Sequence, residues 1–244
     1  MSDRDSSSVL GEKGRGAEEP WPGAVRLEIR DGTIELGGYG ARSTLWDLAV
    51  GVERIRTAPE LETSRCHGCG RCCREPIPVL GLDIGRMAGR LGLSPDQIKA
   101  RYLRFPESPD PVARRRDIES LKRQMDLSMM EATLIYEHNR AEPVTTKRDE
   151  RGRCIFLEDN LCSIYEDRPY ICRLYTCNMG ERLSILYEQV ENQGVWHSYV
   201  ALGWLEAKEV VHNPFLGAED YRSIPLSQFD VPLEGAMEKV FFFF

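Results

Sequence analysis

Eight cysteines are the side chains in this sequence best suited to chemistry, and they fall into two groups. No cysteine precedes residue 66; four lie within residues 66–73, and four more lie within residues 154–177. The N-terminal stretch has no apolar core typical of a secretory signal, so we expect a cytoplasmic protein. Clustered thiols in a reducing compartment are metal ligands or redox groups more often than disulfides. We therefore predict that these cysteines bind a metal.

The first group has the pattern CxxCxxCC and consists of Cys66, Cys69, Cys72 and Cys73. Two-residue gaps allow successive thiolates to turn toward one centre, and the glycines in the gaps permit the backbone conformations that such a loop needs. The spacing is closer to the opening of a bacterial ferredoxin loop than to a zinc-finger pair. On an α-helix, adjacent residues project about 100° apart. We therefore expect Cys72 and Cys73 to face different sides, with one of them serving a second centre or neighbouring the first.

The second group consists of Cys154, Cys162, Cys172 and Cys177. Pro169 is expected at the first position of a helix, which places Cys172 in the opening turn. There the helix dipole and the side chains of Arg168 and Arg173 favour a thiolate. Arg168 and Arg173 are therefore predicted to bind a cofactor by offsetting its negative charge. Cys177 lies five residues further on, about 140° round a continued helix, and need not share a centre with Cys172.

Together the two groups resemble the CxxCxxCC cysteine-cluster family (YkgJ-type), described as a zinc- or iron-chelating domain and related to the cysteine domain of flagellin lysine N-methylases. The resemblance covers residues 64–177 and rests on the first cysteine group, residues 81–96, Cys154, Cys162–Tyr165 and Arg168–Arg173. It implies a metal-binding module in which seven cysteines follow the family pattern and Cys177 is an addition. Members are labelled iron–sulfur proteins or, in one branch, flagellin methylases.

The thiolate-only ligand set and the CxxCxxC spacing favour a [4Fe–4S] cluster as the cofactor, and eight cysteines are enough for two clusters. Zinc is the alternative, because four thiolates also bind zinc well. Three functions follow as hypotheses. They are an iron–sulfur protein with a redox or electron-transfer role (an oxidoreductase), a structural zinc-binding interaction or maturation factor, and a protein methylase-like enzyme. The last would need an S-adenosylmethionine site, and the sequence has no glycine-rich nucleotide motif.

The composition argues against several classes of partner. The 244 residues include 32 Lys and Arg against 39 Asp and Glu, a formal net charge of −7, which opposes binding to a nucleic-acid backbone. No run approaches the roughly 18 to 20 apolar residues that span a bilayer, so no membrane span is predicted. The aromatic run Phe241–Phe244 would form an apolar patch if it were exposed. It is expected to pack back onto the protein or to dock onto a redox or other protein partner.

The elements that must position the cysteines are predicted to form an α+β protein that is mainly helical. We expect a small cysteine-rich, metal-centred domain with an N-terminal β-hairpin and a C-terminal helical extension. Residues 1–22, rich in Ser, Gly and Glu, are predicted to be disordered, and residues 23–63 to form a hairpin with its turn at Asp31–Gly32, then a helix. Residues 64–180 form the cysteine-cluster domain, and residues 181–244 form the extension with its aromatic tail.

Further helices are predicted from apolar periodicity and start signals. They are expected at residues 82–91, at 94–105, from Pro111 onward, and as two helices within 181–212. Apolar residues that recur at helical spacing are predicted to face the core. After Pro111 these include Ile118, Met125, Met129, Ala132 and Tyr136, and within the last segment they include Trp196, Tyr199 and Trp204.

Overall fold

The described part of the chain begins with the predicted hairpin. The computed structural model describes residues 24–56, 70, 72–106, 111–129, 132, 136, 143–209 and 213–229. Strand β1 (Val25–Arg30) pairs antiparallel with β2 (Thr33–Tyr39). Asp31 and Gly32 between them have φ values of 51° and 76°, as a two-residue hairpin turn requires. The predicted disordered tail (residues 1–22) and the predicted partner-binding tail (Phe241–Phe244) lie outside the described residues.

Helix α1 (Leu45–Arg56) follows the hairpin and packs against β1. Its start is capped reciprocally: the Thr44 backbone N–H donates to Asp47 Oδ2 at 2.9 Å, and the Asp47 backbone N–H donates to Thr44 Oγ1 at 3.3 Å. One face of the helix is buried, and it comprises Leu45, Leu48, Ala49 and Val52. The helix predicted after the hairpin is therefore present and faces the core.

The helix pair predicted after the first cysteine group is also present, as α2 (Gly81–Leu91) and α3 (Pro95–Tyr102). Gly92 ends α2 in the left-handed conformation at φ 64°, and the Ser94 hydroxyl caps α3 by accepting from the Gln97 backbone N–H at 3.2 Å. Helix α3 ends earlier than predicted. The next residues form β3 (Leu103–Arg104), which pairs antiparallel with β4 (Thr145–Thr146).

Short elements carry the second cysteine group. Strands β5 (Leu157–Glu158) and β6 (Leu161–Cys162) form a tight hairpin, with Asp159 and Asn160 at φ values of 46° and 63° in its turn. A 3-10 turn (Tyr165–Asp167) then leads to α6 (Tyr170–Leu174). Pro169 lies immediately before α6, so the helix start agrees with the prediction to within one residue.

The prediction of two helices within residues 181–212 is wrong. In the described part of this segment there is one α-helix, α7 (Glu181–Ala201), and it is followed by irregular chain with 3-10 turns at Ala207–Glu209 and Leu226–Gln228. Trp196 and Tyr199 are buried as predicted, but Trp204 lies beyond the helix end and is 47% exposed. Neither α7 nor any other helix in the described ranges is long and apolar enough to cross a membrane.

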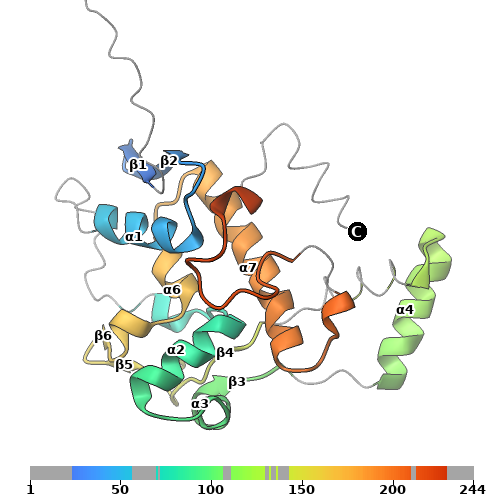
Figure 1. The fold of residues 1–244 in the computed structure, drawn as a ribbon. Helices are drawn as coiled ribbons and strands as arrows, with labels where there is room; N and C mark the ends of the chain where they lie inside the picture. The colour runs from blue at the N-terminus through green and yellow to red at the C-terminus, as the bar shows by residue number, and fades with distance from the viewer. Residues whose placement is uncertain are drawn as a thin grey trace, which may run out of the picture.

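Two clusters of buried side chains hold these elements together. The larger cluster joins the hairpin, α1, α6, α7 and residues 213–229, and its bulkiest members are Tyr170, Phe215, Tyr221 and Phe229. The smaller cluster joins α2, α3 and β3 to the chain around the second cysteine group, through residues such as Val79, Met87, Ile98 and Phe156. Helix α6 packs against both α1 and α7 (Figure 1). The fold is α+β and mainly helical, as predicted.

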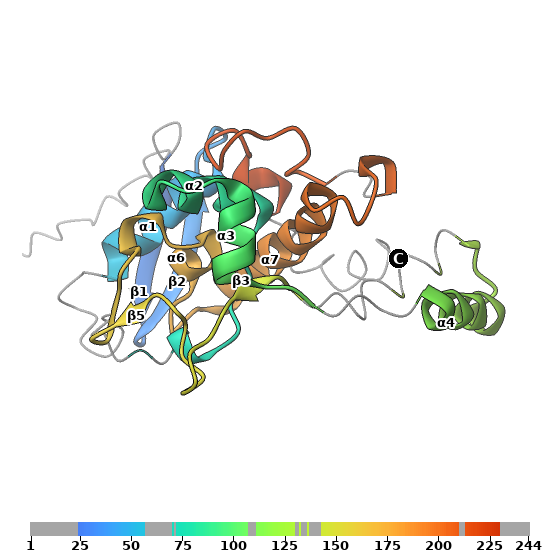
Figure 2. The same cartoon turned by 90° about the horizontal axis from the view of Figure 1, so that it is seen from below.

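Helix α4 (Pro111–Met125) lies apart from these clusters in two perpendicular views (Figures 1 and 2). Ile118, Ala132 and Tyr136 are buried in a small cluster of their own. Met125 and Met129 are 55% and 46% exposed, so the prediction that these methionines fill a core is wrong. Part of the predicted apolar face is therefore buried, at Ile118, Ala132 and Tyr136, whereas the two methionines are not.

Gly194 marks a close approach of α7 to the chain that enters α2. A Cβ added at this residue would lie 2.6 Å from Leu80 Cδ1, and Leu80 is fully buried. We expect Gly194→Ala to lower the free energy of unfolding by about 1–2 kcal/mol, because overpacking outweighs the gain in helix propensity. Gly89→Ala in α2 meets nothing within 4 Å and should raise it by up to about 1 kcal/mol. Urea denaturation measures both, and equal signs would contradict this packing.

Candidate metal centre

The structure brings the two cysteine groups together from opposite ends of a long intervening segment. Cys72 and Cys73 lie in a one-turn 3-10 helix (Cys72–Arg74), and Cys154 precedes β5. The Cys154 backbone N–H donates to the Cys73 carbonyl at 2.7 Å, and an Arg148 guanidinium N–H donates to the Arg74 carbonyl at 2.5 Å. Hydrogen bonds to the backbone therefore hold the two cysteine groups side by side, as predicted.

Six cysteines are described, and all six are free thiols: Cys72, Cys73, Cys154, Cys162, Cys172 and Cys177. Cys66 and Cys69 lie outside the described residues. Cys162 ends strand β6, and Cys172 lies in α6. Cys177 is exposed beyond the end of α6 and stands apart in this respect from the other five, which are partly buried.

The five partly buried thiols lie close enough to perturb one another. A hydrogen bond between the side chains of Cys72 and Cys73, with Sγ atoms 4.0 Å apart, lowers the pKa of Cys72 and raises that of Cys73. Burial raises the pKa of Cys172, and the nearby thiols of Cys154, Cys162 and Cys72 raise it further. These thiols cannot all ionise side by side unless a positive ion compensates their charge, which is the donor chemistry of a metal-thiolate site.

The prediction that Cys72 and Cys73 face different sides is not met. The prediction assumed an α-helix, in which adjacent side chains diverge, but the segment is a single 3-10 turn with the two sulfurs 4.0 Å apart. Cys154 has a further partner, because its Sγ lies 3.2 Å from Thr146 Oγ1 on β4. Within the described residues, no three His, Cys, Asp or Glu side chains are arranged to hold one metal ion.

Arg168 and Arg173, the two predicted charge-offsetting residues, have different surroundings. Arg168 is 5% exposed, forms an ion pair with Glu53 of α1 and lies over the Tyr165 ring, with Cζ 3.8 Å from the ring centroid. Its charge contributes to lowering the pKa of Cys162, although burial outweighs it and the pKa is raised. Arg173 lies against Trp46, and its buried Nε and one terminal nitrogen have no hydrogen-bond partner among the described residues.

Arg56 is a residue of the candidate site that the sequence did not reveal. It ends α1, is 6% exposed, and donates to the carbonyls of Arg173 and Tyr175 at the end of α6. Its charge also helps to lower the pKa of Cys72. An arginine in the last turn of a helix is usually explained by the helix dipole, so its sequence position gave no indication of this contact.

Glu53 anchors the segment that leads into α6. It accepts a hydrogen bond from the Tyr165 hydroxyl at 2.6 Å and pairs with Arg168. Burial raises the pKa of Glu53, but the Tyr165 hydrogen bond and the charges of Arg168 and Arg56 outweigh it and hold the pKa below its usual value. Glu53 is therefore held in its ionised form at this position.

Replacing Glu53 with glutamine is expected to lower the free energy of unfolding by about 2 kcal/mol, because it leaves the buried Arg168 without its counter-charge. Glu28 provides a matched control, since it pairs with the exposed Arg30 on the hairpin. Glu28→Gln should cost less than about 0.5 kcal/mol. Urea denaturation of both variants makes the comparison, and equal losses would show that the Glu53 pair has no special role.

Asp83 is a second residue that the sequence did not single out, and it connects three segments. Its carboxylate is buried and accepts from the Leu80 N–H at 3.0 Å, from the Tyr170 N–H at 3.0 Å and from the Tyr221 hydroxyl at 2.7 Å. It thus caps α2 and also the first turn of α6, two residues before Cys172. An acidic residue three positions after a helix cap was the available signal, but it predicts only the local cap.

Asp83 should make stability depend on pH. Burial raises its pKa to about 6 from 3.8, although its three hydrogen bonds oppose the shift. The folded protein therefore holds this proton more tightly than the unfolded chain. The resulting stabilisation is full below about pH 4 and is lost as the pH rises through about 6. We expect the free energy of unfolding of the wild type, minus that of Asp83→Asn, to fall by about 2 kcal/mol between pH 4 and pH 7. A constant difference across a pH series of urea denaturations would contradict the raised pKa.

Comparison with known proteins was made for the whole chain. Residues 65–194, more than half of the sequence, match the family designated CxxCxxCC, described as "Putative zinc- or iron-chelating domain". The matched range includes both cysteine groups, Asp83 and α6, and confirms the resemblance noted in the sequence. No curated protein and no solved structure matches the chain.

Proposed function

We propose that this chain, which belongs to the CxxCxxCC family of zinc- or iron-chelating domains, holds an iron–sulfur cluster and has a redox or electron-transfer role. Metal binding is the property that the family assigns to the chain. The nature of the metal group and its use are the proposal. One observation carries it: five thiols from two distant segments influence one another's ionisation, but they are not gathered around a single point.

The distribution of the thiols favours a cluster over a single ion. A zinc ion needs four ligands at about 2.3 Å, which brings all of its sulfurs close together. A [4Fe–4S] cluster contains several iron atoms, so that each thiolate binds a different atom and the sulfurs stand further apart. Among the described residues no three thiols are arranged to hold one metal ion, whereas five thiols influence one another's ionisation. A [4Fe–4S] cluster takes four cysteine ligands, and the candidates for them are Cys66, Cys69, Cys72, Cys73, Cys154, Cys162 and Cys172.

The chain's own charges suit a redox centre. A bound iron–sulfur cluster supplies one-electron chemistry, and its potential depends on nearby charge and solvent exposure. Arg56 favours the thiolate of Cys72, and Arg168 acts in the same direction on Cys162. Both guanidinium groups are almost completely buried, so water screens their charge little, and Glu53 lies close enough to pair with each of them. Such cations stabilise the reduced, more negative form of a bound cluster and so raise its reduction potential.

Anaerobic purification followed by metal and sulfide analysis tests the proposal. We expect about four iron and four labile sulfide per cluster, and a paramagnetic resonance signal that appears on reduction. One or more equivalents of zinc without labile sulfide would overturn the cluster. A cluster that shows no redox change within the range of biological potentials would leave metal binding intact but exclude the electron-transfer role.

A structural zinc site is the second candidate, and one distance favours it. The 4.0 Å between the Cys72 and Cys73 sulfurs is close to the separation of about 3.8 Å expected between two thiolates on one tetrahedral zinc. Zinc without sulfide in the same assay, with no redox signal, would support an interaction or maturation role. The methylase-like enzyme stays a prediction from family resemblance, and calorimetry with S-adenosylmethionine is its test.

A further inference from the structure

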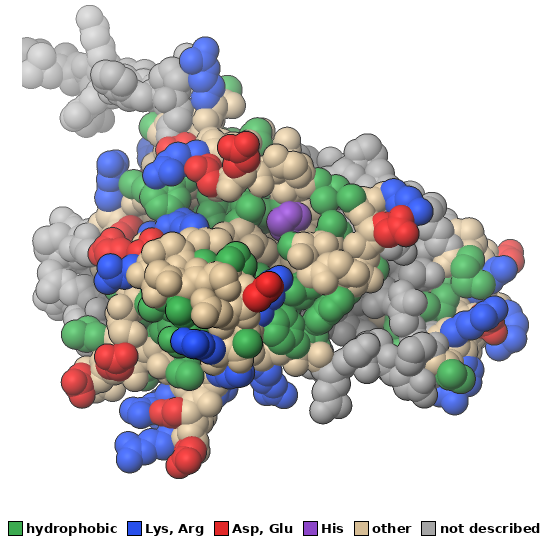
Figure 3. All heavy atoms as spheres, turned by 60° about the horizontal axis from the view of Figure 1, so that its bottom comes forward, with side chains coloured by type: hydrophobic (Ala, Val, Ile, Leu, Met, Phe, Trp, Pro, Cys, Tyr) green, Lys and Arg blue, Asp and Glu red, His purple; other side chains and the backbone are tan. Residues whose placement is uncertain are grey.

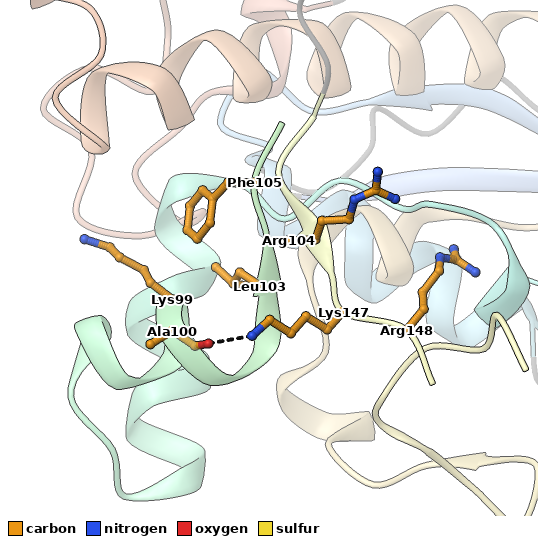
Figure 4. A pocket seen from close by; sticks show the side chains of 7 residues that line it. All are labelled: Lys99, Ala100, Leu103, Arg104, Phe105, Lys147 and Arg148. Atoms are coloured by element: carbon orange, nitrogen blue, oxygen red, sulfur yellow. Dashed lines mark hydrogen bonds between the residues drawn. The ribbon is translucent and has the colours of Figure 1, made fainter. Parts of the chain in front are cut away.

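A cationic pocket opens beside the candidate metal centre. It encloses about 600 Å³, and its walls come from the end of α3, from β3 and from the residues that follow β4 (Figure 4). The lining includes Lys99, Arg104, Lys147 and Arg148 together with the apolar side chains of Leu103 and Phe105. Its described lining contains no Asp or Glu. In a protein with a net charge of −7, such a concentration of positive charge points to an anionic ligand.

The cationic side chains are held in place but retain donors for a ligand. Lys147 Nζ donates to the Ala100 carbonyl at 2.6 Å, and Arg148 donates from one terminal nitrogen to the Arg74 and Gly152 carbonyls at 2.5 Å each. An ammonium has three N–H donors and a guanidinium five, so these contacts use only part of their capacity. Figure 4 shows the Lys99 and Lys147 side chains on the side of β3 on which the Phe105 ring lies, whereas the guanidinium groups of Arg104 and Arg148 extend to the other side. Two ammonium groups suit a phosphate group, which they bind as point charges.

The aromatic ring of Phe105 forms the apolar edge of the pocket. Phe105 contacts the Trp204 ring in an edge-to-face arrangement, with centroids 6.0 Å apart, and Trp204 remains 47% exposed. Leu103 closes the inner wall and is 1% exposed. A flat apolar group of a ligand could therefore pack beside Phe105 while its charged end meets Lys99 and Lys147. The volume lies within the range of about 300–1,000 Å³ that is typical of small-molecule sites.

The space-filling view shows where basic side chains gather on one face of the molecule. Figure 3 turns the underside of Figure 1 forward, and Lys and Arg side chains gather toward the lower edge of that face, with some acidic side chains among them. Lys99 pairs with Asp96 at 3.3 Å, but Asp96 is 92% exposed, so this pair neutralises little of the pocket's charge.

We infer that this pocket binds a small organic phosphate whose other end is flat and apolar, with a nucleoside diphosphate as the representative chemistry. The pocket shares backbone with the cysteine site. Arg148 holds the carbonyl of Arg74, the residue after Cys73, and the Lys147 carbonyl accepts from the Ile155 N–H, the residue after Cys154. Ligand binding would therefore affect the position of the two segments that carry Cys73 and Cys154, whichever metal these cysteines hold.

Isothermal calorimetry on the full-length, metal-loaded protein tests the inference with three probes: ADP, inorganic pyrophosphate and adenosine. We expect ADP to bind at one site per chain, pyrophosphate to bind more weakly, and adenosine to bind most weakly. Metal content measured before and after each titration excludes chelation by the phosphates as the source of heat. Absence of ADP binding, or equal affinity for ADP and pyrophosphate, would overturn the inference.

Variants locate the site. Lys99→Gln should weaken ADP binding about tenfold, because it removes a charged hydrogen bond. Arg101→Gln is the matched control, since Arg101 is an exposed cation of neighbouring α3 that does not line the pocket. An equal loss for both variants would mean nonspecific charge attraction. Phe105→Leu should weaken ADP and leave pyrophosphate unchanged, and the opposite pattern would contradict the role of the aromatic wall.

Discussion

Replacing Cys172 with serine is expected to release the metal and lower the thermal midpoint of unfolding by roughly 10 °C or more. Cys172 lies in α6 among the thiols of Cys154, Cys162 and Cys72, and its helix is part of the main core. A metal bound there ties together segments that are far apart in sequence, so its binding energy stabilises the fold. A loss of about 3–5 kcal/mol corresponds to a shift of this size for a chain of this length.

Cys177→Ser is the control, because Cys177 is exposed beyond the end of α6. It should leave metal content and the thermal midpoint nearly unchanged. Wild-type protein stripped by a chelator provides a second comparison and should melt close to the Cys172→Ser variant. If Cys177→Ser lost the metal to the same extent, Cys177 would have to be a ligand. If the stripped wild type melted like the loaded protein, the metal would not stabilise the fold.

Replacing Asp83 with alanine is expected to lower the free energy of unfolding by about 3–5 kcal/mol. The substitution leaves the Leu80 and Tyr170 backbone N–H groups and the Tyr221 hydroxyl without their acceptor in a buried site. Each unsatisfied buried donor costs about 1–3 kcal/mol. The total is a large fraction of the free energy of unfolding of a typical domain, which is about 5–15 kcal/mol. The loss should appear in urea denaturation of the metal-free protein, which separates it from metal binding.

Asp96→Ala is the matched control for this substitution. Asp96 lies in the first turn of α3 and is 92% exposed, so its loss should cost less than about 0.5 kcal/mol. A second measurement concerns the site itself. Because Asp83 holds the first turn of α6, the alanine variant should also bind metal more weakly than the Asp96 variant. Unchanged metal affinity together with lost stability would assign Asp83 to the fold alone.

Local signals in the sequence predicted the local elements well. Asp31–Gly32 predicted the hairpin turn, and Ser94 and Pro95 predicted the start of α3, because each signal acts on its own few residues. The contacts that shape the metal centre are of another kind. Asp83 meets Tyr170 and Tyr221, and Arg56 meets the end of α6, across more than 80 residues. Such pairs depend on how the elements pack, which no local pattern encodes.

The errors have physical reasons of the same type. The divergence predicted for Cys72 and Cys73 assumed helical geometry, but the segment makes only a 3-10 turn. The core predicted for Met125 and Met129 followed from spacing, which identifies an apolar face but not what covers it. The spacing of the cysteines, by contrast, was enough to predict that the two groups meet, because clustered thiols have few other uses in a reduced protein.

Helix α6 has only five residues, far fewer than the roughly 12–15 at which an isolated helix becomes even marginally stable in water. It exists because side chains from elsewhere hold both of its ends: Asp83 binds the N–H of its first residue, and Arg56 binds the carbonyls at its last turn. We therefore expect α6 to open together with the core around it, so that its amide hydrogens exchange with solvent as slowly as those of α1 and α7.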